Sequence, residues 1–141
     1  MPKLSRPEAS NELAITFFYY RDLPAAMQFY EDVLGLPLAI DQGWCKIYRI
    51  CPGAHVGLVD ETRGMNKWAA TKPVQLCIRV PKVEDWYAYA KAEKLDNLSA
   101  LFVNDDIGIR AFVFTDPEGY PENSEAYSEI YTSKPIPVLQ F

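Results

Sequence analysis

Cysteine and histidine are scarce in this sequence of 141 residues, which contains three cysteines and one histidine. Cys45, Cys51 and Cys77 are odd in number and form no CxxC pair, so neither a disulfide framework nor a zinc knuckle is indicated. A serine or cysteine triad would need a histidine beside its nucleophile, and only His55 could supply it. The cysteine pattern favours a reducing compartment, and we expect a cytoplasmic protein.

Basic charge and long apolar runs are also limited. Fourteen Lys and Arg residues stand against 19 Asp and Glu residues, with a formal net charge of -5, and no basic stripe could neutralise a phosphate backbone. No segment approaches the roughly 18 consecutive apolar residues of a membrane span, and the N-terminus has no apolar signal-peptide stretch. We therefore expect neither a nucleic-acid nor a membrane partner. The motifs GxGxxG, GxxxxGK[ST], GxSxG and HExxH are absent.

Hydrophobic residues are plentiful, at 49% of the chain, and 13% of the residues are aromatic. This composition can build a buried core, and the length suits one domain spanning residues 1–141.

Residues 13–60 predict a first unit with a strand, a helix and three more strands. Asp22 suits the N-cap of the helix, Pro24 suits its first turn, and Gly35 suits a left-handed residue that ends it. The predicted strands are 13–20, 38–41, 44–50 and 54–59, with a Pro-Gly turn at 52–53.

After a connector at 61–73, residues 74–141 predict the same order of elements. We expect a strand at 74–80, a helix from Val83 to about Leu95, and strands at 98–103 and 107–115. The fourth strand is either 121–127 or 135–141. The pattern favours the later segment, because its Ile and Val residues have β character that the sequence PENSEAY lacks.

A shift of 60 residues aligns the two units without gaps, placing Phe18 on Ile78, Leu23 on Val83 and Phe29 on Tyr89. Together with the matching element order, this register predicts an α+β fold made of two βαβββ modules.

Two motifs give these modules a family resemblance. The run RDLPAAMQFYEDVLGLPL in the first module and DPEGY in the second resemble signatures of the vicinal-oxygen-chelate superfamily, which includes glyoxalases, bleomycin-resistance proteins and extradiol dioxygenases. The resemblance covers residues 13–120 and implies a curved mixed sheet around a cavity. In that family the concave face carries a divalent metal held by His, Glu or Gln on the first and last strands of each module. The fold serves many reactions and binding functions, so it does not define the activity.

The metal positions that the resemblance implies hold poor ligands. They fall on Ile15, Gly57, Gln75 and Asn123, with Pro137 replacing Asn123 if the last strand is 135–141. Ile15 and Gly57 have no donor atom in the side chain, and the glutamine carbonyl is a weak ligand. We expect no bound metal and no cofactor.

Strand alternation predicts which side chains line the concave face. A two-residue turn at 52–53 would pair Ile50 with His55, Tyr48 with Gly57 and Lys46 with Val59, and Gly57 would leave a hole for a ligand. The expected ligand-binding residues are Phe17, Tyr19, Trp44, Lys46, Tyr48, His55, Gly57, Gln75, Arg79 and Arg110.

An aromatic-walled cleft with a few polar groups is typical of a small-molecule site. We expect a small-molecule-binding protein without the family metal. The alternative is a lyase or isomerase acting on a small oxygenated metabolite, with His55 as acid or base and Arg79 or Lys46 stabilising negative charge. A third hypothesis is a structural or regulatory dimer. A homodimer is expected from the family resemblance and from Trp68, which has no evident core partner in the sequence.

Overall fold

The computed structural model describes residues 4–127, and its two halves repeat one arrangement. The strands of the first half are β1 (Ala14–Tyr20), β2 (Leu38–Asp41), β3 (Cys45–Cys51) and β4 (Ala54–Asp60). Its helix is α1 (Leu23–Gln28), continued by a wider π-helical turn over Phe29–Val33. The second half has β5 (Leu76–Arg79), α2 (Val83–Ala92), β6 (Phe102–Asn104), β7 (Ile109–Thr115) and β8 (Pro121–Tyr127).

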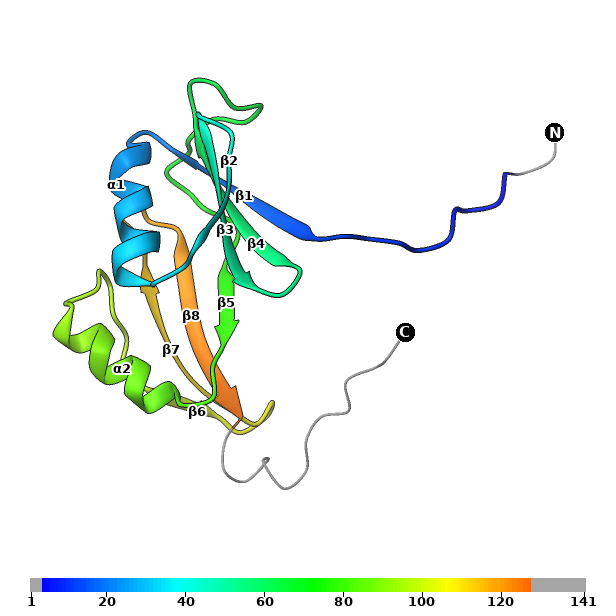
Figure 1. Ribbon diagram of the computed structural model, residues 1–141. Helices are drawn as coiled ribbons and strands as arrows, with labels where there is room; N and C mark the ends of the chain where they lie inside the picture. Colours follow the sequence, from blue (N-terminus) through cyan, green and yellow to red (C-terminus); the bar gives the residue numbers. More distant parts are fainter. Residues whose placement is uncertain (1–3, 128–141) are drawn as a thin grey trace.

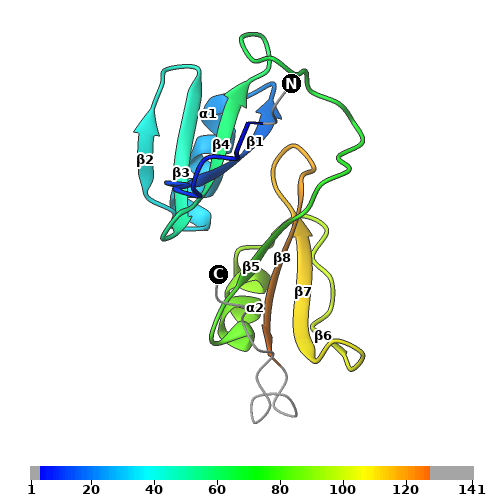
Figure 2. The same ribbon diagram turned by 90° about the vertical axis from the view of Figure 1, so that its right-hand side faces the viewer.

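Each half forms a four-stranded sheet with the same strand order, β1-β4-β3-β2 in the first and β5-β8-β7-β6 in the second. The first and last strands of each half pair in parallel, and the remaining neighbours are antiparallel (Figures 1 and 2). The two helices begin at Leu23 and Val83, in the predicted 60-residue register. The predicted pair of βαβββ modules in an α+β fold is confirmed.

The preference for 135–141 as the fourth strand of the second module was wrong. Segment 121–127 takes that place as β8, between β5 and β7, whereas 135–141 lies outside the described residues. Pro121 is tolerated because it is the first residue of the strand. Pairing on both sides supplies the backbone hydrogen bonds that stabilise this polar segment despite its weak β propensity.

The first helix forms where its local signals predict it. The Asp22 side chain accepts a hydrogen bond from the backbone N–H of Ala25 at 3.1 Å, and Gly35 has a φ of 71° directly after the last turn. These contacts cap both ends of the helix, and its buried residues Ala26, Phe29 and Tyr30 face the sheet.

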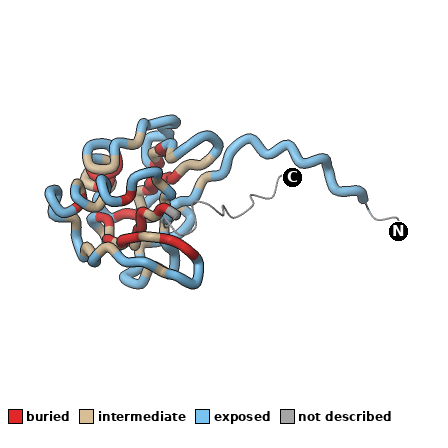
Figure 3. Tube along the Cα trace, turned by 90° about the horizontal axis from the view of Figure 1, so that it is seen from below, coloured by how far each residue is buried: buried red, intermediate tan, exposed pale blue. Residues whose placement is uncertain are grey.

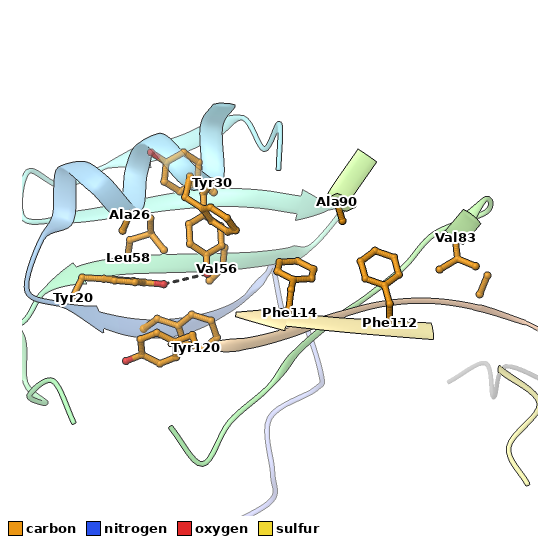
Figure 4. Packing of buried hydrophobic residues seen from close by; sticks show 14 residues of the cluster. Tyr20, Ala26, Tyr30, Val56, Leu58, Val83, Ala90, Phe112, Phe114 and Tyr120 are labelled. Atoms are coloured by element: carbon orange, nitrogen blue, oxygen red, sulfur yellow. Dashed lines mark hydrogen bonds between the residues drawn. The ribbon is translucent and has the colours of Figure 1, made fainter. Parts of the chain in front are cut away.

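Both helices lie on the same side of the two sheets, and no helix of the described residues covers the opposite face of either sheet (Figure 1). The main core lies under the helices and runs through both modules, so that Phe18, Tyr30 and Val56 belong to the same cluster as Val83 and Phe112 (Figure 4). Buried positions concentrate in the body of the molecule, while the leader before β1 is exposed (Figure 3).

The turn of the DPEGY motif holds the modules together. Asp116 accepts hydrogen bonds from the hydroxyls of Tyr20 and Tyr30, and the Glu118 carboxylate accepts from two backbone N–H groups at the end of β1. The Tyr120 ring stacks on Phe18 with centroids 4.2 Å apart, and its hydroxyl bonds the backbone of Tyr19. The motif therefore has a structural role at the junction of the two modules.

Candidate functional site

The candidate site lies on the sheet faces away from the helices, here called the concave face. In the first module, β1 contributes Ile15, Phe17 and Tyr19, because their neighbours Phe18 and Tyr20 point into the helix-covered core. The parallel register places His55 beside Ile15 and Gly57 beside Phe17. The structure therefore brings five predicted positions of β1 and β4 onto one face. They are Ile15, Phe17, Tyr19, His55 and Gly57.

The predicted register of the β3–β4 hairpin was wrong by one residue. His55 pairs with Arg49, and Gly57 pairs with Ile47, because a bulge at Ile50 shifts the ladder. Pro52 followed by Gly53 with a φ of 80° makes a type II turn, whose twist does not match that of the strands, and a bulge can correct the mismatch. The Pro-Gly pair was the sequence signal for this bulge.

The shift moves two predicted site residues to the helix side of the sheet. Tyr48 is fully buried in the main core, where its hydroxyl donates to Glu31 at 2.7 Å. Lys46 lies on the same side and pairs with Asp41 at 2.6 Å. Cys45, Ile47 and Arg49, which the sequence analysis missed, occupy the concave positions of β3 instead.

Gly57 leaves no open hole on this face. A Cβ atom at residue 57 would lie 2.5 Å from Cδ1 of Phe17 and 3.3 Å from Cγ2 of Ile15, so the Phe17 ring already covers the glycine. Within residues 4–127, the expected cavity bordered by Tyr48, Trp44 and His55 is therefore absent. The Phe17 ring itself is 43% exposed and forms part of the accessible surface.

A small apolar pocket of about 130 Å³ lies beside this ring. Phe17, Tyr19 and Trp44 line it together with Cys45 and Val59, and the loop after β4 closes one side. The Tyr19 hydroxyl accepts a hydrogen bond from Asn66 of that loop at 2.9 Å. Three of the predicted aromatic site residues thus share one pocket on the concave face.

In the second module, polar side chains on the concave face of β5, and of Gln75 just before it, pair with side chains of β8. The Gln75 side chain donates to Asn123 at 2.7 Å, and Arg79 forms an ion pair with Glu125. The neighbouring Cys77 is an exposed residue, but desolvation by the surrounding side chains raises the pKa of its thiol, which disfavours a reactive thiolate.

Arg110 does not belong to this face. It shares the helix side of β7 with Phe112 and Phe114, and it forms an ion pair with Glu84 of α2. The prediction that Arg110 lies on the concave face was wrong, because the sequence alternation of β7 did not define which set of residues points toward the helix.

The residues at the family metal positions do not fit a metal ion. Ile15 and Gly57 lie next to each other without a donor atom, and the amides of Gln75 and Asn123 are hydrogen bonded to each other. Within residues 4–127, no group of three or more His, Cys, Asp or Glu side chains could hold a metal. Divalent ions need several oxygen or imidazole donors, and these four positions do not supply them.

His55 is the only histidine of the chain and lies on the concave face, half-buried between Ile15 and Arg49. Its Nδ1 atom is buried and has no hydrogen-bond partner among the described residues. Lys46, one of the two cations expected to assist it, lies on the other side of the sheet.

Trp68 has a partner within its own chain, contrary to the sequence interpretation. The guanidinium of Arg21 lies 3.6 Å from its ring centroid and the Lys72 ammonium lies 4.0 Å from it. Trp68 is consequently no argument for an intermolecular contact. Neither helix in the described part of the chain has the length and apolar character needed to cross a membrane.

Comparison with solved structures finds the same fold at low sequence identity. A glyoxalase/bleomycin resistance protein/dioxygenase from Nocardioides is 20% identical, with a TM-score of 0.70 over 97% of this chain and 93% of that one. A lactoylglutathione lyase from Agrobacterium tumefaciens is also 20% identical, with a TM-score of 0.66 over 86% and 96%. TioX from Micromonospora sp. ML1 is 17% identical, with a TM-score of 0.67 over 82% and 98%.

Comparison with curated proteins finds no match. The family model described as Glyoxalase/Bleomycin resistance protein/Dioxygenase superfamily matches residues 12–121, which include both modules up to the start of β8. With the repeated βαβββ topology, this match shows that the chain belongs to the glyoxalase/bleomycin resistance protein/dioxygenase superfamily.

Proposed function

We propose that the chain is a single-domain small-molecule-binding protein that holds its ligand on the concave face without a metal ion. The observation that carries this proposal is the apolar pocket formed by Phe17, Tyr19 and Trp44 beside positions that lack metal donors. Aromatic rings offer large apolar contact areas, so ligand binding rests on stacking and burial.

The binding test is mass spectrometry of the purified chain after incubation with a metabolite mixture and removal of unbound compounds. We expect one compound class to be retained by the wild-type chain and lost from Phe17→Ala. Leu38→Ala is the control, because Leu38 is exposed to a similar extent, 40% against 43%, on the other side of the same sheet. Retention by Phe17→Ala, or no retained compound in the wild type, contradicts the proposal.

The absence of a metal is tested separately by elemental analysis of protein purified without chelator. We expect far less than one equivalent of Zn, Ni, Mn or Fe per chain. A value near one equivalent would show that side chains other than Ile15, Gly57, Gln75 and Asn123 hold a metal.

A lyase or isomerase activity is the second candidate function, and the buried, unpartnered Nδ1 of His55 favours it. A catalytic acid or base contributes about 10²–10⁴-fold to the rate, whereas one lost hydrogen bond changes binding by about 0.5–1.5 kcal/mol. His55→Ala therefore separates the two functions. A modest loss of affinity supports binding, and a loss of turnover of about a hundredfold or more on the retained compound supports catalysis.

We also propose that the chain forms a homodimer through its concave face. Phe17, Ile40, Trp44 and Met65 are exposed there and leave an apolar surface without a covering element among the described residues. Light scattering is expected to give twice the 16.0 kDa chain mass. The monomer mass across a wide concentration range would contradict this.

A further inference from the structure

A second cavity lies on the helix side of the sheets, where the two modules meet. It has a volume of about 250 Å³ and is separate from the concave-face pocket. Leu36 and Ile50 of the first module form part of its wall, and Ala90, Phe112 and Phe114 of the second module form most of the rest. The cavity is therefore apolar and enclosed by both halves of the chain.

One acidic side chain, Glu122 of β8, lies in this apolar wall. Glu122 is 1% exposed, and neither carboxyl oxygen has a hydrogen-bond partner among the described residues. The neighbouring Tyr30 hydroxyl donates to Asp116 at 3.0 Å, and its interaction with Glu122 lowers the Glu122 pKa by less than burial raises it. An isolated buried carboxyl is costly, and a ligand that pairs with it would recover that cost.

The charged groups around Glu122 do not supply it with a cation. Arg79 also borders the cavity, but its guanidinium is paired with Glu125. Burial raises the pKa of Glu122 well above its usual range, and the charge of Asp116 raises it further. Tyr20 and Tyr30 are the other titratable groups that interact with it, and both are neutral at ordinary pH because burial raises their pKa values. This environment favours a positively charged partner over an anionic one.

The surface groove next to the cavity is also lined by acidic and aromatic side chains. This groove shares Leu34, Trp86 and Tyr89 with the cavity wall, and Asp32 and Asp85 also line it. Acidic and aromatic side chains together attract organic cations, through charge and through the faces of the rings.

We propose that the junction cavity binds a small organic amine, with its apolar body against Phe112, Phe114 and Ile50 and its ammonium paired with Glu122. This site differs from the concave face in position and chemistry. Asn123, the next residue of β8, points to the concave face, so neighbouring side chains of one strand serve the two sites.

The test uses 2-phenylethylamine and the neutral 2-phenylethanol as matched probes, titrated into the full chain by calorimetry. We expect the amine to bind at least about tenfold more tightly than the alcohol, since only the amine can form a charged pair. Binding of the ammonium form should break the O–H bond of the Glu122 carboxyl and release that proton to solvent, and the heat of binding should then differ between two buffers of different ionisation enthalpy. Equal affinities, or no measurable binding of the amine, would overturn the proposal.

Two variants test whether Glu122 is the group that pairs with the amine. Glu122→Gln keeps the size of the side chain and should weaken amine binding by about tenfold or more while leaving 2-phenylethanol unaffected. The control Glu93→Gln removes an exposed charge at the end of α2 and should change affinity by less than about twofold. Unchanged amine affinity in Glu122→Gln would refute the pairing.

Methyl NMR of the wild-type chain provides a readout that does not depend on a variant. The amine should shift the methyl signals of Ile50 and Ala90 at the cavity, and leave those of Ile15 and Val59 on the concave face unchanged. Shifts confined to Ile15 and Val59 would assign the amine to the concave face and refute the junction site. A negative result in the metabolite-retention experiment with Phe17→Ala would not change the conclusion about the amine site, because the two sites are separate.

Discussion

Asp116→Ala should destabilise the folded protein by about 3–5 kcal/mol, because it leaves buried hydroxyl and backbone donors without their acceptor, at about 1–3 kcal/mol for each unsatisfied group. The Asp116 carboxylate is 1% exposed and accepts from the hydroxyls of Tyr20 and Tyr30. It also accepts from the backbone N–H groups of Glu118 at 3.0 Å and Tyr120 at 2.9 Å. Hydrogen bonds to a charged group contribute about 1.5–3 kcal/mol each, and desolvation of the carboxylate offsets several kcal/mol of their sum.

Asp116→Asn tests whether these hydrogen bonds are the cause. The amide oxygen can still accept from both backbone N–H groups, and the amide nitrogen can donate to the hydroxyl oxygens of Tyr20 and Tyr30. We expect a loss of about 1 kcal/mol or less for Asn. Asp106→Ala is the control for removal of a carboxylate, because Asp106 is exposed in the loop between β6 and β7, and its midpoint should stay unchanged within error.

Urea unfolding followed by far-UV circular dichroism measures these differences, provided that the slope of the transition stays constant between variants. A loss below about 1 kcal/mol for Asp116→Ala would show that the turn does not hold the modules together. Equal losses for Ala and Asn would show that the size or charge of the side chain, rather than its accepted hydrogen bonds, is responsible.

Three further outcomes are expected. Burial raises the pKa of both Asp116 and Glu122, so the folded state binds more protons than the unfolded state, and the urea midpoint should rise as the pH falls from about 7 to about 5; Glu122→Gln should reduce this rise, and a falling midpoint would contradict it. Gly57→Ala should cost about 1–3 kcal/mol because the Phe17 ring must move, and the cost should vanish in a Phe17→Ala background, as a double-mutant cycle would measure. Tyr48→Phe removes a buried hydroxyl bond of 2.7 Å and should lower stability by about 1 kcal/mol without changing the affinity for any concave-face ligand.

The carboxyl groups of this chain differ in how their contribution to stability depends on pH, because their surroundings differ. Asp41, which is exposed, and Asp60, which is partly exposed, accept hydrogen bonds that lower their pKa values. Their contribution to stability is lost only as the pH falls below the usual range of a carboxyl group. The buried pair Asp116 and Glu122 responds at higher pH and with the opposite sign. The expected pH dependence between about 5 and 7 therefore reports on the module junction.

The sequence by itself determined the repeated βαβββ order and the limits of the first helix. These depend on local chemistry: Asp22 caps its own helix, Gly35 adopts a positive φ, and alternating side chains define a strand wherever it pairs. The 60-residue register needed no contact information, because both modules carry the same local pattern. The aromatic character of the concave face, with Phe17 and Tyr19 on one strand, followed from alternation alone.

The tertiary structure decided which residues share a site. A bulge at Ile50 turned Lys46 and Tyr48 away from the concave face, because a shift of one residue in a strand reverses every side chain. Segment 121–127 became a central strand because β5 and β7 satisfy its backbone, a long-range contact that residue propensities do not encode. The same pairing placed Glu122 in the apolar cavity between the modules, since burial depends on what packs above a residue and not on its own polarity.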